Sequence, residues 1–163
     1  MSTRPNIKLS EHFTLYEIMH GTNLSAASAM LNWKAYDKEF KQERWAQLCG
    51  AVEVVRAVMN DGRYDALKID PTRDIGFEVT AGFRCLAHEK SRGRAGTSQH
   101  TVGAALDVQP TNVGRTNAVK ILRELHAMYN PTWGGGLAIA HPRTKQSIGF
   151  IHFDLGKRRR WDY

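Results

Sequence analysis

The sequence predicts an α+β protein in which helices pack on one face of a small, mainly antiparallel sheet. Two observations support this fold class. Apolar residues recur at spacings of three and four between positions 45 and 59, which is typical of one face of a helix. Two later segments, 104–108 and 148–155, alternate in character and are rich in apolar residues, which is typical of strands with one buried face.

The first half of the chain, about residues 8–75, is expected to be helical. One helix is predicted from about Lys41 to Asn60, where Asp61-Gly62 provides a stop signal. Its apolar series consists of Trp45, Leu48, Val52, Val55 and Met59. A loop containing Pro71 and Asp74 then leads to the second half. Aromatic residues expected in the core or in helix packing are Trp33, Phe40, Trp45 and Tyr64.

The second half, about residues 76–163, is expected to be mainly β. Residues 88–97 are rich in Lys, Arg and Gly, which indicates a mobile basic loop. A second helix is predicted over about 116–129, ended by Asn130-Pro131. The glycine run 134–136 precedes a short apolar strand over 137–140. The apolar face predicted for the helix combines Ala118, Val119, Ile121, Leu122, Leu125 and Met128.

The segment from Ser98 to Asp107 places a histidine, His100, and a carboxylate seven positions apart across a turn at Gly103. In the strand that follows, Asp107 shares a face with Ala105 and Gln109, whereas Leu106 and Val108 face the other way. In the later strand, His152 and Asp154 share a face in the same manner. Zinc prefers a few nitrogen and oxygen ligands, and a catalytic zinc keeps one position open. The pattern predicts a zinc site on the open face of the sheet.

The pattern Ser-x-His-x-x-Gly-x-Ala-x-Asp, followed by a distal His on a strand, resembles the zinc D-Ala-D-Ala carboxypeptidase family, which includes murein endopeptidases and phage endolysins. The resemblance extends to residues 79–85, 134–137 and 150–156, and to the ending Arg159-Arg160-Trp161. The opening segment 9–15 is also similar to an N-terminal element of phage members.

The resemblance implies that His100, Asp107 and His152 hold one Zn²⁺ per chain, that Ser98 supports the site and that Arg84 faces the substrate. Arginine suits a peptide carbonyl or carboxylate because its fork donates two hydrogen bonds and stays charged. The implied activity is a zinc metallopeptidase of the D,D-carboxypeptidase or endopeptidase type, acting on peptidoglycan stem peptides.

One departure from the family concerns the general base, because the positions that carry an acid or a histidine in many members are Gly149 and Phe150 here. Asp154 is the leading candidate for the base or for a partner that supports the metal site, and His141 is the next. An alternative assignment makes Asp154 the ligand and His152 the catalytic histidine.

Neither of the two cysteines lies in a recognisable catalytic signature. Cys49 lies beside the apolar series of the first helix and is expected to be a small buried side chain. Cys85 follows Arg84 near the expected cleft, which predicts partial exposure, and a disulfide between the two is left open.

Length and composition predict one domain over residues 1–163, because 163 residues with 42% hydrophobic and 24% charged residues suffice for one core. We expect a monomer without a membrane span, because no apolar run approaches the roughly 18 residues that one needs. The first residues lack a secretory signal. The expectation is a protein made in the cytoplasm that reaches the cell wall through a holin or in a virion, as a phage endolysin or virion-associated lysin.

Two other functions remain open at this point. A noncatalytic peptidoglycan-binding module would explain the missing base. The net charge of +7 and the basic run 157–161 allow a nucleic-acid-binding protein, but no nucleic-acid-binding signature accompanies the run and no specific nucleic acid is expected. A solvated terminal tail is the simpler interpretation of this run. The pattern does not select the peptide bond that is cleaved.

Overall fold

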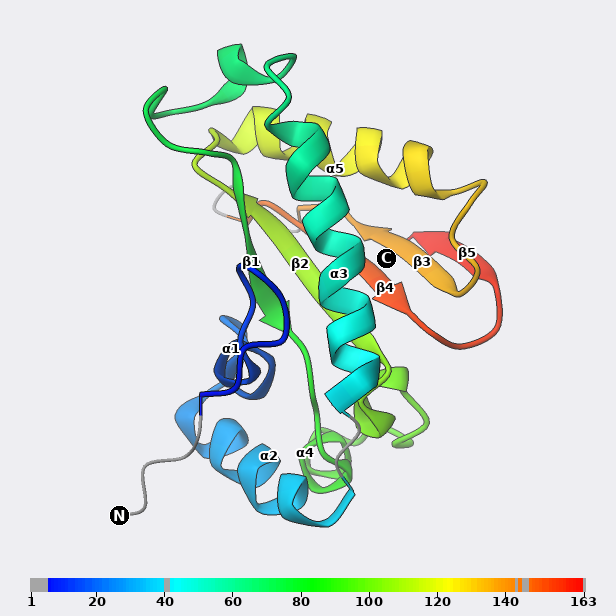
Figure 1. Cartoon of the computed structure of the whole chain (residues 1–163). Coiled ribbons are helices and arrows are strands. Elements are labelled where there is room, and N and C mark those ends of the chain that lie inside the picture. Colours follow the sequence, from blue (N-terminus) through cyan, green and yellow to red (C-terminus); the bar gives the residue numbers. More distant parts are fainter. Residues whose placement is uncertain (1–5, 40–41, 143, 145–146, 163) are drawn as a thin grey trace.

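The computed structural model describes residues 6–39, 42–142, 144 and 147–162, without the side chains of residues 37–39. The architecture is α+β, with a five-stranded, mostly antiparallel sheet (Figure 1). The helices are α1 (Leu15–His20), α2 (Ala26–Glu39), α3 (Gln42–Met59), α4 (Leu86–Ser91) and α5 (Arg115–Tyr129), with the short 3₁₀ turns η1 (Asp65–Leu67) and η2 (Gln99–Val102). The strands are β1 (Gly76–Ala81), β2 (Ala105–Thr111), β3 (Gly136–Ala140), β4 (Phe150–Asp154) and β5 (Arg159–Asp162).

The sheet has the strand order β1-β2-β4-β3-β5. All neighbouring pairs are antiparallel except β3 and β5, which are parallel. The two central strands, β2 and β4, come from distant parts of the chain. The centre of the sheet is therefore where residues near 107 and near 152 meet.

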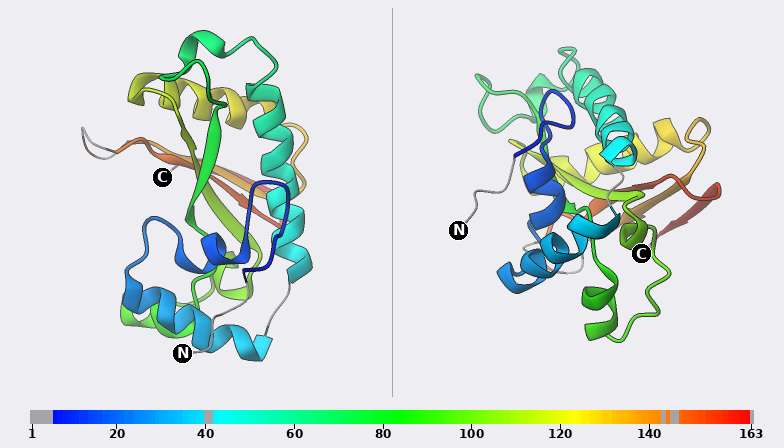
Figure 2. Two further views of the ribbon diagram at one scale, coloured as in Figure 1. Left: turned by 60° about the vertical axis from the view of Figure 1, so that its left-hand side comes forward. Right: turned by 60° about the horizontal axis from the view of Figure 1, so that its bottom comes forward.

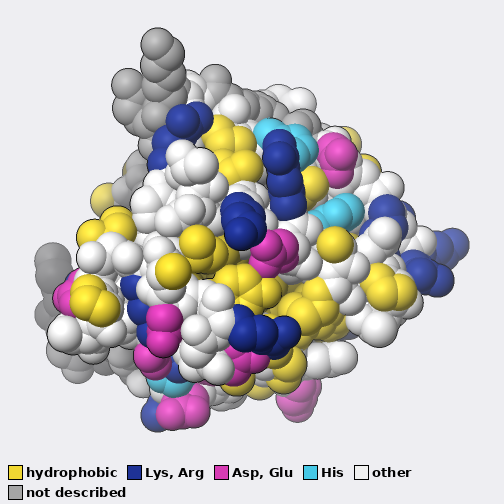
Figure 3. Space-filling view, turned by 90° about the horizontal axis from the view of Figure 1, so that it is seen from above, with side chains coloured by type: hydrophobic (Ala, Val, Ile, Leu, Met, Phe, Trp, Pro, Cys, Tyr) yellow, Lys and Arg dark blue, Asp and Glu magenta, His cyan; other side chains and the backbone are white. Residues whose placement is uncertain are grey.

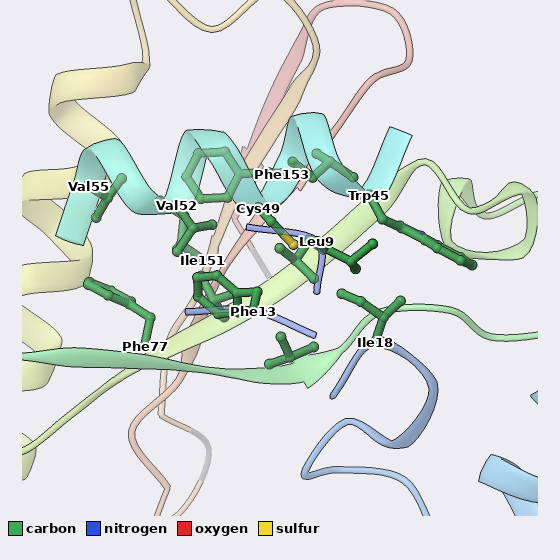
Figure 4. Packing of buried hydrophobic residues seen from close by; sticks show 14 of the residues in the cluster. Leu9, Phe13, Ile18, Trp45, Cys49, Val52, Val55, Phe77, Ile151 and Phe153 are labelled. Atoms are coloured by element: carbon green, nitrogen blue, oxygen red, sulfur yellow. The ribbon is translucent and has the colours of Figure 1, made fainter. Parts of the chain in front are cut away.

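One face of the sheet is covered by α3 and α5, while α1, α2 and α4 gather at one end of the molecule (Figures 1 and 2). In α3, the buried side chains Trp45, Cys49, Val52 and Val55 point toward the sheet, where they pack near Phe153 (Figure 4). Because residues from both halves of the chain join one buried cluster, the core fixes the sheet against the helices.

The helices follow the sequence periodicity closely. The first predicted helix is α3, except that Lys41 lies outside the described residues, and the second is α5. In α5, Ala118, Ile121, Leu122 and Leu125 are buried, a spacing that forms one face. Met128 was expected on this face but is 39% exposed. Trp33 and Trp45 are buried and Tyr64 is partly buried, whereas Phe40 lies outside the described residues.

The basic run 157–161 is not a solvated tail, because most of it forms the edge strand β5. Arg160 donates hydrogen bonds to the carbonyl oxygens of Asn130, Trp133 and Gly135, at distances of 2.6 to 2.8 Å. These bonds attach the end of the chain to the turn before β3. Within the described residues, none of the helices combines the length and apolar character needed to cross a membrane.

Candidate metal centre

The first two residues of the site are a carboxylate, Asp107, and an imidazole, His152, on the two central strands. The register of β2 and β4 places Asp107 directly opposite His152. Their neighbours Leu106 and Phe153 are fully buried on the helix-covered side. Since adjacent residues of a strand point to opposite faces, Asp107 and His152 lie together on the other face. The alternation of both strands therefore predicted correctly which of their side chains share a face.

The third residue, His100, comes from the turn η2 that precedes β2. Ser98 caps this turn, because its Oγ accepts a hydrogen bond from the backbone N–H of His100 at 3.3 Å. Gly103 ends the turn with φ of 65°, a left-handed conformation that favours glycine. The turn thus directs His100 toward the first residues of β2.

The three side chains converge closely. His152 Nδ1 lies 2.6 Å from Asp107 Oδ1, and His100 Nε2 lies 3.3 Å from the same oxygen. One ligand atom from each residue can be chosen so that all three lie within 4.8 Å of one another. All three residues are buried, at 1–5% exposure. The structure therefore brings together the three residues that the sequence pattern singled out.

The protonation of His100 tests whether this group suits a cation. Its Nδ1 lies 2.6 Å from the carbonyl oxygen of Gly82, so Nδ1 carries the proton and donates it. The remaining Nε2 then has only a lone pair, is buried and has no hydrogen-bond partner among the described residues, yet it faces the Asp107 carboxylate. Two electron-rich groups that face each other in a buried site fit a metal ion between them.

The electrostatics also suit a metal site. Burial lowers the pKa of His100, so its imidazole is neutral, as a ligand must be. Burial alone would raise the pKa of Asp107, but the hydrogen bond between its Oδ1 and His152 Nδ1 holds it below its usual range, so Asp107 is ionised. The group thus offers two imidazole nitrogens and one carboxylate, a donor set that zinc accepts.

His152 is held from behind by Asp154. Its Nε2 lies 3.1 Å from Asp154 Oδ2, which leaves Nδ1 directed toward Asp107. Burial alone would lower the pKa of His152, but the hydrogen bonds to Asp107 and Asp154 raise it. Carboxylates that hydrogen-bond the second nitrogen of a ligating histidine fix its orientation and tautomer.

Asp154 is fully buried and engaged on both oxygens. Besides His152, it accepts hydrogen bonds from Arg159 Nη2 at 2.9 Å and from the backbone N–H groups of Gly136 and Gly156. Burial would raise the pKa of Asp154, but these hydrogen bonds lower it. This geometry favours support of His152 over the role of general base, the other role that the sequence left open for Asp154.

The glycine run before β3 makes room for Asp154. A Cβ on Gly136 would collide with the Asp154 carboxylate, at 2.6 Å from its Cγ, and one on Gly135 would collide with the Asp154 carbonyl oxygen. Gly156 is close as well, since its Cβ would lie 2.9 Å from Asp154 Oδ1. Gly134, in contrast, has open space around it.

We call His100, Asp107 and His152 the metal group. A cleft of about 570 Å³ opens beside the metal group, and its wall includes Asp107, Ser98 and Arg84. Arg84 is tied to the site through its backbone, whose N–H donates to the His100 carbonyl oxygen at 3.2 Å. Its guanidinium Nε lies 3.5 Å from Glu89 Oε1. The arginine expected to face the substrate therefore lines the cleft.

His141 does not belong to the three-residue group. It follows β3 and lines a second hollow together with Gln109, Asn23 and Phe150. Asn23 and Phe150 also line the cleft, so the two hollows adjoin. His141 thus lies to one side of the cleft.

Two expectations about this region are wrong. Cys85 is not partly exposed but buried, because it is the N-cap residue before α4 and its backbone N–H donates to Asn32 Oδ1; both cysteines are free. Residues 88–97 are not a loop throughout, because α4 extends to Ser91. Glu89 of this helix is buried and pairs with Arg94 at 3.0 Å, which attaches the following segment to the helix.

The sequence pattern does not identify Glu89, Arg159 or Trp161 as site residues, although Glu89 lines the cleft, Arg159 bonds Asp154 and Trp161 lies beside His152. The Trp161 ring lies beside that of His152, with centroids 5.2 Å apart, and the Arg159 guanidinium lies over Trp161 at 4.7 Å. The only local signal was the basic and aromatic ending, which periodicity alone does not connect to residue 152.

Comparison with protein families gives a match to a known family. The family model described as Peptidase M15 matches residues 22–137, which is more than half of the chain. Searches of curated proteins and of solved structures return no match. The matched segment includes two residues of the metal group, His100 and Asp107, and ends within β3.

Proposed function

The chain belongs to the Peptidase M15 family of zinc peptidases, and from this premise we propose that it hydrolyses an amide bond in the stem peptide or cross-link of peptidoglycan. The observation that supports this most directly is the convergence of His100, Asp107 and His152 beside an open cleft. A D,D-carboxypeptidase or endopeptidase activity is the specificity we propose. The biological setting we propose is that of a phage endolysin or virion-associated lysin.

His100, Asp107 and His152 are the residues that would hold the zinc. When bound, a zinc ion supplies Lewis-acid chemistry, because it polarises a peptide carbonyl and makes water a stronger nucleophile near neutral pH. The protein holds the two imidazoles in the required tautomers through the carbonyl of Gly82 and the carboxylate of Asp154.

Arg84 is proposed to bind and orient the peptide. It lines the cleft close to Asp107, and its charge is held in place by the buried Glu89. Ser98 maintains the turn that presents His100. His141, in the adjoining hollow, is the proposed carrier of the proton to the leaving amine, because Asp154 is sealed behind His152.

The nucleic-acid alternative has lost its main support. Arg160 bonds backbone carbonyls and Arg159 bonds Asp154, so this part of the basic run serves the fold. On the face seen in Figure 3, Lys and Arg side chains are separated by acidic, apolar and uncharged groups. No continuous basic stripe of the kind that follows a phosphate backbone is visible on this face.

Digestion of defined muropeptides, with the products identified by mass spectrometry, tests the proposed activity. The wild type is expected to release a new amine, to lose activity in a chelator and to regain it with zinc. His100→Ala is expected to be inactive and to contain no zinc, whereas His126→Ala on α5 serves as a matched control that keeps both. Retained zinc and peptidoglycan binding without any new amine would identify a noncatalytic module.

A further inference from the structure

The cleft beside the metal group has a basic wall. Apart from Asp107 and Ser98, its polar lining comes largely from Arg84, from α4 and from the segment that follows α4. The charged or titratable residues of this part of the wall are Arg84, His88, Glu89, Arg92 and Arg94. None of them is part of the group proposed to hold the metal.

Glu89 organises two of the arginines. Its side chain is only 3% exposed, and its Oε1 lies 3.0 Å from Arg94 Nη1 and 3.5 Å from Arg84 Nε. A buried carboxylate requires paired charges, so both guanidiniums are held in place. A merely solvated basic surface would not need such a buried anchor.

Arg92 adds a third positive charge. It is exposed, and within the described part of the chain no acidic side chain pairs with it. Three arginines therefore face a single carboxylate, Glu89, which leaves this wall with an excess of two positive charges. Asp107 does not offset them, because it is committed to the metal group.

His88 does not change this balance. Burial lowers its pKa; Glu89 opposes this effect, while Arg92, Arg84 and Arg94 add to it. His88 is therefore neutral, and its buried Nε2 has no hydrogen-bond partner among the described residues.

We propose that Arg92 and Arg94 bind a second anionic group of the substrate, away from the bond that is hydrolysed. The enzyme then prefers stem peptides with a free carboxylate over peptides in which that carboxylate is amidated. This inference rests on the proposed function and adds the substrate class. A guanidinium has five N–H donors, so Arg94 keeps donors for a carboxylate while it pairs with Glu89.

The test uses pairs of muropeptides that differ only by a free or amidated carboxyl group. Binding is measured by calorimetry with the zinc-free protein, so that the readout does not require hydrolysis. The free carboxylate is expected to bind roughly tenfold more tightly than the amide, because hydrogen bonds to charged groups are the stronger ones. This preference is expected to weaken as salt is added.

Arg92→Gln is expected to reduce the preference to about twofold or less and to leave binding of the amidated peptide nearly unchanged, because Arg92 makes no ion pair that the fold requires. Arg94→Gln is expected to act in the same direction, with circular dichroism to verify folding. Arg123→Gln on the exposed face of α5 removes the same charge outside the cleft and is expected to keep the preference.

Equal binding of the free and amidated members of every pair by the wild type would overturn the inference. An undiminished preference in Arg92→Gln would also overturn it. If the wild type prefers the free carboxylate in binding but hydrolyses no muropeptide, the proposed function fails while the inferred recognition stands. If the wild type hydrolyses muropeptides but shows no preference for the free carboxylate, the proposed function stands and the inferred recognition fails. The two failures are therefore distinguishable.

Discussion

At the scale of single residues, two carboxylates contact the two ring nitrogens of His152. Asp107 lies at Nδ1, on the side that His100 also faces, whereas Asp154 lies at Nε2. Among the described residues, Asp107 is the carboxylate that offers an oxygen within 4.8 Å of a ring nitrogen of both His100 and His152. The contact with Asp154 at Nε2 leaves Nδ1 as the nitrogen of His152 that points toward Asp107 and His100.

Replacement of Asp154 tests this division. Asp154→Asn is expected to lower zinc affinity by about 10- to 100-fold, because loss of a supporting hydrogen-bond partner weakens a ligand without removing it. Hydrolysis is expected to fall as well. Zinc affinity is measured by competition with a chromogenic chelator, and Asp162→Asn in β5 serves as the exposed control. Complete loss of zinc binding would support the alternative in which Asp154 is itself a ligand.

At the scale of elements, the register of β2 and β4 creates the site. A slip of one residue would move Asp107 or His152 into the core, because successive side chains point to opposite faces. The turn before β3 matters as much, because its backbone passes directly over Asp154. Within the glycine run, Gly136 leaves the space that this carboxylate occupies.

The glycine run supplies a matched pair of substitutions. Gly136→Ala is expected to lower the free energy of unfolding by about 1–3 kcal/mol, because its Cβ has no room beside the Asp154 carboxylate. It is also expected to weaken zinc binding, since the displaced carboxylate supports His152. Gly134→Ala, whose Cβ meets nothing within 4 Å, is expected to change both quantities little. Urea unfolding and zinc titration measure them, and equal effects of the two substitutions would contradict this account.

At the scale of the whole molecule, the segment before α1 is attached to α3 by one carboxylate. Glu53 accepts hydrogen bonds from Ser10 Oγ at 2.6 Å and from the His12 backbone N–H at 2.7 Å. The His12 ring nitrogen Nδ1 lies 2.9 Å from the same side chain. Burial alone would raise the pKa of Glu53, but these partners lower it below its usual value of 4.5.

This contact predicts a pH-dependent stability. A carboxyl whose pKa is lowered by folding stabilises the fold above its unfolded pKa, and the contribution disappears as the pH falls through its folded pKa. Glu53→Gln is expected to lower the free energy of unfolding by about 1 kcal/mol at pH 7. The difference in the free energy of unfolding between the wild type and Glu53→Gln is expected to shrink as the pH falls below about 4.5. Denaturant unfolding at several pH values measures it, with the exposed Glu43→Gln of α3 as control. A deficit that stays constant down to pH 3 would contradict the assignment.

By itself, the sequence determined the α+β class, the positions of α3 and α5, the faces of β2 and β4, and the three residues that meet at the metal group. The helix positions and strand faces are local features, since periodicity reports which side of an element is buried, whereas His100, Asp107 and His152 were identified by a motif that spans two separate segments. The tertiary structure decided the rest. Asp154 became a support for His152, the basic ending became β5 beside the site, and Glu89 anchored two arginines at the cleft. Such contacts depend on strand order, register and packing between segments far apart in the chain, which no local pattern records.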